Sequence, residues 1–155
     1  MNFNLIKTTV NDAEILWEMQ ISAFKELLDK YHDFDTNPAS EPLEKVLIRL
    51  RQPFTYYYFI KLNSENIGAI RVVDKKSEMG KKRISPLFIL PEFRNKGYAQ
   101  RAVLQVEKIH GDCGWELETI LQEKCNCHLY EKLGYQRTDK FKIINPLMTL
   151  IIYEK

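Results

Sequence analysis

The spacing of hydrophobic positions along the chain changes between a strand-like period of two and a helix-like period of about 3.6. Residues 3–8 alternate and predict a short first strand. From Ala13 the apolar positions follow a helical stripe, and residues 31–40 are rich in loop formers. Ser40 and Pro42 then open a second predicted helix. The first strand is therefore expected to be followed by two helices.

The rest of the chain predicts six more strands and two more helices. The strands are expected at 54–62, 67–73, 83–90, 115–121, 135–142 and 147–153, with a turn at 63–66, and the helices at 97–110 and 126–133. The stripe expected to be buried in the first of these helices is Ala99, Ala102, Val103, Val106 and Ile109. Alternate side chains of the run 56–58 are expected to point inward and outward. The order predicts a single α/β domain over residues 1–155 with a mixed sheet.

Composition agrees with one globular domain and argues against several partners. The chain has 155 residues, of which 45% are hydrophobic and 28% charged, and its net charge is +2 with both signs interspersed. A nucleic-acid partner is not expected, because that function needs a concentrated basic face. The densest basic run, residues 81–83, is interpreted as solvated.

Targeting and redox signals point to the cytoplasm. No apolar stretch follows Met1, and no apolar run approaches the length of a membrane span, so neither a signal peptide nor a membrane partner is expected. The cysteines are Cys113, Cys125 and Cys127, an odd number that favours reduced thiols.

The segment between the strand at 83–90 and the helix at 97–110 combines features of a phosphate site. The first N–H groups of a helix have no intrahelical acceptor, and the helix dipole adds partial positive charge there. Gly97 permits close backbone approach, while Arg94 and Lys96 add full charges. The alternative is an ordinary solvated turn. The segment lacks a Walker ending and carries only one glycine, unlike a dinucleotide fingerprint.

Two motifs in this part of the chain resemble the GNAT superfamily of N-acetyltransferases. The run Arg94-Asn95-Lys96-Gly97-Tyr98-Ala99 looks like the superfamily's pyrophosphate loop, Arg/Gln-x-x-Gly-x-Gly/Ala, and Leu90-Pro91-Glu92-Phe93 is similar to its lead-in. Downstream, residues 129–135 resemble its Tyr-Glu-Lys-Leu-Gly-Phe stretch. The resemblance implies a mostly antiparallel seven-stranded sheet, flanked by about four helices and splayed between the strands at 84–90 and 115–121.

The resemblance also implies a co-substrate, acetyl-coenzyme A, and roles for individual residues. The backbone of Leu87, Phe88 and Ile89 would pair with the pantetheine arm, and the amides of 94–99 would cradle the pyrophosphate. Tyr130 matches the tyrosine that approaches the coenzyme sulfur, where a hydroxyl can protonate the leaving thiolate. The alternative is a purely structural aromatic.

The chain departs from the superfamily in the helix that carries Tyr130. Glu123 stands where an asparagine is frequent, and Asn126 is the candidate that compensates for it.

The base and the acceptor site are less defined by sequence. Glu118 is the preferred general base, since it lies mid-strand beside the expected cleft. Burial there would favour its protonated form. The alternative is a solvated strand position on the same face as Glu116. The acceptor is expected to contact the first two helices, residues 31–40 and the strand at 54–62, whose aromatic rings and carboxylates suit a cationic amine.

Three functions remain in competition. The first is acetyl transfer to the primary amine of a small molecule by direct attack in a ternary complex. The second is acetylation of a protein N-terminus or lysine, and the third is a non-catalytic coenzyme A-binding domain, against which Tyr130 argues. A homodimer is left open. No metal is expected, because the spacing of Cys125 and Cys127 lacks a second ligand pair.

Overall fold

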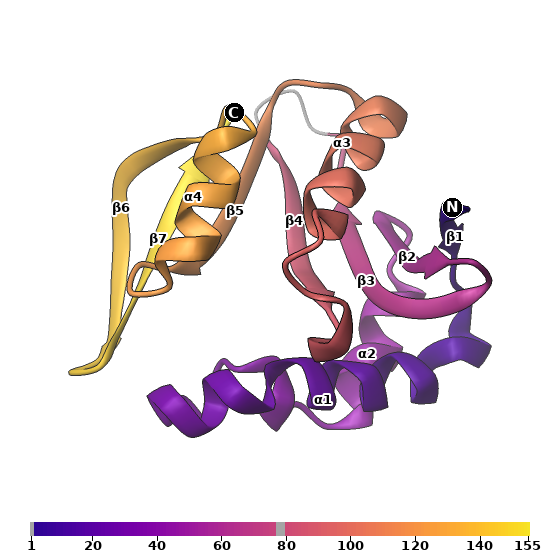
Figure 1. The fold of residues 1–155 in the computed structure, drawn as a ribbon, viewed down its shortest axis with the longest axis horizontal. Helices are drawn as coiled ribbons and strands as arrows, with labels where there is room; N and C mark the ends of the chain where they lie inside the picture. The colour runs from indigo at the N-terminus through magenta and orange to yellow at the C-terminus, as the bar shows by residue number, and fades with distance from the viewer. Residues whose placement is uncertain (1, 77–79) are drawn as a thin grey trace.

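The computed structural model describes residues 2–76 and 80–155 as one seven-stranded sheet with helices on both faces (Figure 1). The strand order is β1-β2-β3-β4-β5-β7-β6. Among the described residues, β4 and β5 pair in parallel and every other neighbouring pair is antiparallel. The strands are β1 (Phe3–Lys7), β2 (Thr55–Leu62), β3 (Glu65–Val73), β4 (Lys82–Ile89), β5 (Trp115–Ile120), β6 (Gln136–Asn145) and β7 (Met148–Glu154). The predicted mixed, mostly antiparallel sheet is confirmed.

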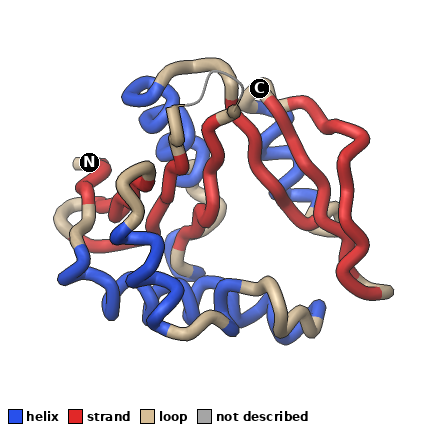
Figure 2. Tube along the Cα trace, turned by 180° about the vertical axis from the view of Figure 1, so that it is seen from behind, coloured by secondary structure: helices blue, strands red, loops and turns tan. Residues whose placement is uncertain are grey.

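The helices divide between the two faces. They are α1 (Ala13–Tyr31), α2 (Leu43–Arg51), α3 (Tyr98–His110) and α4 (Lys124–Lys132). Figures 1 and 2 show α1 crossing below the open end of the sheet, while α3 and α4 each lie against one half of it. No helix in the described ranges is long and apolar enough to cross a membrane.

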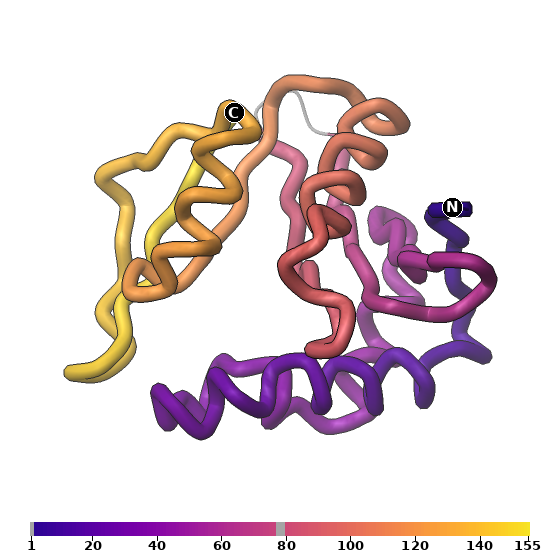
Figure 3. Tube along the Cα trace, viewed as in Figure 1, coloured from indigo at the N-terminus to yellow at the C-terminus, as the bar shows by residue number. Residues whose placement is uncertain are grey.

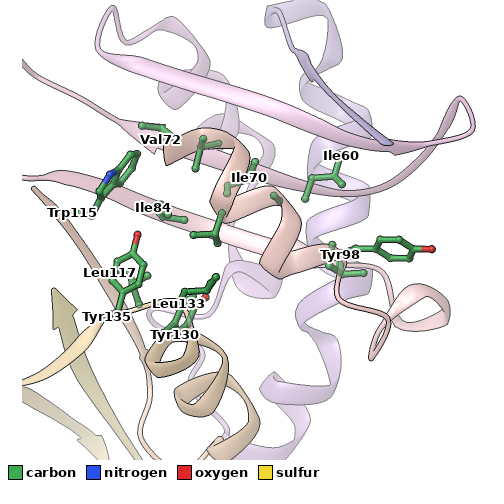
Figure 4. Packing of buried hydrophobic residues seen from close by; sticks show 14 of the residues in the cluster. Ile60, Ile70, Val72, Ile84, Tyr98, Trp115, Leu117, Tyr130, Leu133 and Tyr135 are labelled. Atoms are coloured by element: carbon green, nitrogen blue, oxygen red, sulfur yellow. The ribbon is translucent and has the colours of Figure 1, made fainter. Parts of the chain in front are cut away.

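Two of the three hydrophobic clusters among the described residues contain side chains of β2, and both pack helices against the sheet. Tyr57 and Phe59 pack in the cluster that contains α1 and α2, whereas Tyr58 and Ile60 pack in the larger cluster that contains α3 and α4 (Figure 4). The outward-facing side chains expected of the tyrosine run are therefore covered as well. The reason is that helices cover both faces of this strand, so its alternation does not separate core from solvent.

The sheet opens between its two halves. β4 pairs with β5 only from Lys82 to Ile84, and the remainder of β4 diverges (Figure 3). On its other edge, β4 carries a bulge, since two residues of β4, Ser85 and Pro86, face the single residue Arg71 of β3. Pro86 has no N–H to give to a ladder. The predicted splay is confirmed.

Two local expectations are wrong. Ile109 is exposed, because the buried face of α3 is formed by Tyr98, Ala102, Val103, Val106 and Glu107. Glu107 enters the core because its carboxylate accepts hydrogen bonds from the Tyr135 hydroxyl and the Lys155 ammonium, both at 2.8 Å. The turn after β2 is also tighter than predicted: Asn63 and Ser64 have φ of 50° and 72°, so the hairpin needs only these two residues.

Candidate active site

Two cavities lie along the opening of the sheet. The larger, about 450 Å³, is enclosed by α1, the end of β4, the 93–100 segment and α4. The smaller, about 190 Å³, is enclosed by α1, residues 33–38, the bulge of β4, β5 and β7. The residues common to both linings are Phe24, Leu27, Leu87, Asn126 and Tyr130. The two cavities therefore meet at these side chains.

The loop before α3 presents free backbone N–H groups to the larger cavity. Asn95 and Gly97 adopt left-handed backbone with φ of 63° and 82°, which turns the chain sharply into the first turn of α3. Among the described residues, the N–H groups from Asn95 to Gln100 have no backbone acceptor. A Cβ built on Gly97 would meet nothing within 4 Å, so this side of the loop is open to a ligand. Such a helix entry is suited to a pyrophosphate.

The charged side chains of this loop are placed differently from the expectation. The guanidinium of Arg94 donates from Nε to the Ile89 carbonyl at 3.0 Å and from Nη2 to the Ala23 carbonyl of α1 at 2.5 Å. Arg94 borders the larger cavity, whereas Lys96 is exposed and outside its lining. Arg94 thus fastens the loop to α1 and β4, and the unpaired backbone amides are the groups of this loop left available to an anion.

The predicted pantetheine edge of β4 lies in the larger cavity. The cavity is lined by Leu87, Phe88 and Ile89, and none of these residues pairs with β5. The Phe88 ring is buried against Phe24 at 5.7 Å between centroids, so its side chain belongs to the core. Backbone groups left unpaired by the splay favour a ligand that completes the ladder.

Tyr130 projects from α4 to the junction of the cavities. It is buried, with its ring 6.1 Å from that of Tyr135 (Figure 4) and 6.3 Å from that of Tyr153. Within the described residues, its hydroxyl has no side-chain hydrogen-bond partner, whereas Tyr135 and Tyr153 donate to carboxylates. Burial raises the pKa of Tyr130 to about 12. The hydroxyl therefore stays protonated at neutral pH and can act as a hydrogen-bond donor where the cavities meet.

Glu123 forms two long-range hydrogen bonds that were not predicted from the sequence. Its carboxylate accepts hydrogen bonds from Lys30, at 2.8 Å, and from the Tyr31 hydroxyl, which ties the end of α1 to the start of α4. Burial alone would raise the pKa of Glu123, but these bonds outweigh it and hold the pKa below its ordinary range. Asn126, one turn later, borders both cavities.

Glu118 borders the smaller cavity and is exposed, which agrees with the alternative of a solvated strand position shared with Glu116 and not with a buried carboxyl. It lies on the same face of β5 as Glu116, and Arg83 of β4 reaches both carboxylates, at 3.6 Å from Glu118 and 3.5 Å from Glu116. Arg83 lies in the short stretch where β4 and β5 still pair. Its contact with Glu118 therefore keeps that carboxylate at the mouth of the cavity.

The rest of the acceptor-side lining was only partly predicted. Phe24 and Leu27 of α1 and residues 36–38 line the smaller cavity as expected of that region, but α2 and β2 do not. Met148 and Leu150 of β7 were missed, because their place beside β5 depends on a long-range strand order that leaves no local signal. In the described ranges, no group of three or more His, Cys, Asp or Glu side chains could hold a metal ion.

The family follows from the sequence comparison. Residues 17–135 match the model of the acetyltransferase (GNAT) family. The chain belongs to this family, and it is an acetyl-coenzyme A-dependent N-acetyltransferase. A search of curated proteins finds no matching relative.

Solved structures share the fold at low sequence identity. A PaiA N-acetyltransferase from Thermoplasma acidophilum, in complex with coenzyme A, has a TM-score of 0.76 at 18% identity over 100% of both chains. The ribosomal-protein-S18-alanine N-acetyltransferase from Escherichia coli has 0.75 at 9% identity, covering 98% of this chain and 92% of the other. A spermidine N-acetyltransferase SpeG chimera from Vibrio cholerae and hSSAT has 0.72 at 12% identity, covering 99% and 95%. The acceptors in these names include both small molecules and proteins.

Proposed function

We propose that this enzyme acetylates the primary amine of a small molecule by direct attack within a ternary complex. The supporting observation is that two cavities meet at Tyr130 and Leu87. Acetyl-coenzyme A supplies an activated thioester and would occupy the larger cavity, which presents the amides of the 95–100 loop and the free edge of β4. The acceptor amine would enter the smaller cavity from the opposite side.

The size of the smaller cavity favours a compact acceptor. Its volume of about 190 Å³ lies below the range of roughly 300–1,000 Å³ typical of drug-sized ligands. Its walls are apolar at Phe24, Leu27 and Met148, and a carboxylate, Glu118, lies at its mouth. This lining suits a small amine with an apolar body. The protein is proposed to act in the cytoplasm, in keeping with free thiols at Cys113, Cys125 and Cys127.

Each part of the chain has a defined task in this proposal. Glu118 accepts a proton from the acceptor ammonium and leaves a neutral amine. Leu87 and Phe24 exclude water where the cavities meet. Tyr130 holds a proton at the position where the leaving thiolate develops.

The acceptor class is tested by measuring thiol release from acetyl-coenzyme A with two matched panels of acceptors. One panel contains compact primary amines with apolar bodies, and the other contains peptides with free N-termini or lysines. We expect kcat/KM for the best small amine to exceed that of the best peptide by at least about tenfold. The reason is that most of a peptide would have to extend out of the small cavity, where it makes fewer contacts. A peptide that is the better substrate would reverse the proposed acceptor class.

The role of Glu118 is tested by Glu118→Gln, with Glu116→Gln as its matched control. Both carboxylates are held by Arg83 on one face of β5, but only Glu118 borders the cavity. We expect Glu118→Gln to lower kcat/KM for the amine by roughly 10²- to 10⁴-fold, the contribution of a general base, with acetyl-coenzyme A affinity unchanged. Glu116→Gln should keep near wild-type activity. Small and equal changes in kcat/KM for the two variants would show that Glu118 is a solvated surface residue and not the general base.

A further inference from the structure

A buried arginine on β3 touches the bulge that opens the sheet. Arg71 is 8% exposed, and its Nη1 donates to the Ser85 carbonyl at 2.7 Å. Nη2 donates to the Gln52 side chain at 2.9 Å, at the end of α2, and lies 3.4 Å from the Thr55 hydroxyl of β2. The guanidinium therefore links the bulge of β4 to two elements on the far side of β3.

Arg71 lies where the ladder between β3 and β4 is interrupted. Ile70 pairs with Leu87 and Val72 with Ile84, so Arg71 faces the extra residues Ser85 and Pro86. The proline offers no N–H, and the side chain of Arg71 takes the Ser85 carbonyl instead of a ladder partner. The bulge is thus held from within the sheet by a side chain.

The charge of Arg71 is poorly compensated for a buried group. Within the described residues it forms no ion pair, and its Nε is buried without an acceptor. The neighbouring carboxylate, Glu41, is taken by Arg49 and Gln20. Burial lowers the pKa of Arg71 to about 10. A buried, unpaired charge is an inefficient way to stabilise a fold, and an apolar residue would serve packing better.

We propose that Arg71 is a positioning residue that holds the β4 bulge in the open form, and thereby places Leu87 to Ile89 for the thioester arm of acetyl-coenzyme A. Ser85 and Pro86 line the smaller cavity, and Leu87 lies at the junction of both cavities. Movement of the Ser85 carbonyl would therefore disturb the binding edge of β4 and one wall of the acceptor site together. The identity of the ligand in this inference rests on the proposed function. The effect of Arg71 on the position of β4 does not depend on it.

The experiment compares Arg71→Met, Arg71→Gln and Arg71→Lys by calorimetric titration with acetyl-coenzyme A and by hydrogen exchange of the 84–90 amides. Methionine has no donor for the Ser85 carbonyl, and glutamine offers only a neutral amide on a shorter side chain, whereas lysine keeps a charged donor on a long one. We expect the first two to bind about 5- to 100-fold more weakly, the loss of one charge-assisted hydrogen bond, and to exchange faster at 84–90. Arg71→Lys should stay within about threefold of wild type, because a charged donor is kept.

A control separates this role from general destabilisation. Thr55→Val removes another polar partner of Arg71 but leaves the Ser85 contact, so it should retain acetyl-coenzyme A affinity and exchange at 84–90. A folded Met or Gln variant that binds like wild type, or a Lys variant as weak as Met, would overturn the inference. If wild type itself fails to bind acetyl-coenzyme A, the proposed function fails, while exchange at 84–90 still decides whether Arg71 holds the strand.

Discussion

Replacing Gly97 with valine should abolish the stabilisation of the protein by acetyl-coenzyme A. Gly97 has a φ of 82°, and its Cβ position faces open space beside free N–H groups of the loop. A valine side chain there would project toward the ligand and prevent the backbone from approaching the pyrophosphate. At a ligand concentration 100 times Kd, binding stabilises a native protein by about 2.7 kcal/mol. Wild type should therefore melt roughly 5–10 °C higher with ligand, and Gly97→Val should show no shift.

The matched control for this variant is Gly114→Val. Gly114 has a φ of 79°, nearly that of Gly97, and an added Cβ would meet only Lys82 Nζ, at 3.9 Å. Both variants carry the same left-handed strain, of about 1–3 kcal/mol, so both should melt lower than wild type without ligand. Gly114 lies outside both cavities, and its variant should keep the full ligand shift. A normal rise in melting temperature with ligand in Gly97→Val would show that the pyrophosphate does not bind at this loop.

The order of the elements was predictable because its determinants are local. The period of apolar positions, the turn formers and the residues 94–99 each act within a few positions of themselves. The opening of the sheet was expected from the superfamily resemblance, and the described pairing of β4 with β5 confirms it. Local signals therefore predicted the order of the elements, whereas the pyrophosphate site at 94–99 stays a prediction.

The partners of the charged side chains could not be read from the sequence. Arg94 was expected to face a phosphate, yet carbonyls of α1 and β4 hold it. Glu123 binds Lys30 and Tyr31, which lie more than ninety positions away. Arg71 sits in a β-branched strand pattern with no sign of its role at the bulge. Such contacts depend on how distant elements come together, which no window of the sequence contains.

Tyr130→Phe should remove most of the turnover while leaving the fold and cofactor binding nearly intact. The ring and its packing against Tyr135 and Tyr153 remain, and the lost hydroxyl has no side-chain partner among the described residues. Because the pKa of Tyr130 is raised to about 12, the group stays protonated across the neutral range and is available as an acid there. Loss of a general acid lowers turnover by roughly ten- to ten-thousandfold, with the small end expected if water protonates the thiolate.

Tyr153→Phe provides the matched control. Tyr153 is a buried tyrosine whose ring lies 6.3 Å from that of Tyr130, but its hydroxyl donates to Glu131 and lies outside both cavities. Removing that bonded hydroxyl should cost stability of about 1 kcal/mol and leave turnover unchanged. The two variants therefore separate an effect on chemistry from an effect on packing.

The catalytic role of the cavity junction is tested most directly by the kcat of Tyr130→Phe relative to wild type, measured at saturating acetyl-coenzyme A with the best small amine. If the Tyr130 hydroxyl protonates the leaving thiolate, kcat should fall by at least about tenfold, with melting temperature and acetyl-coenzyme A affinity close to wild type. A wild-type kcat in a folded Tyr130→Phe protein would contradict this role, because the hydroxyl at the junction of the two cavities would then take no part in the transfer.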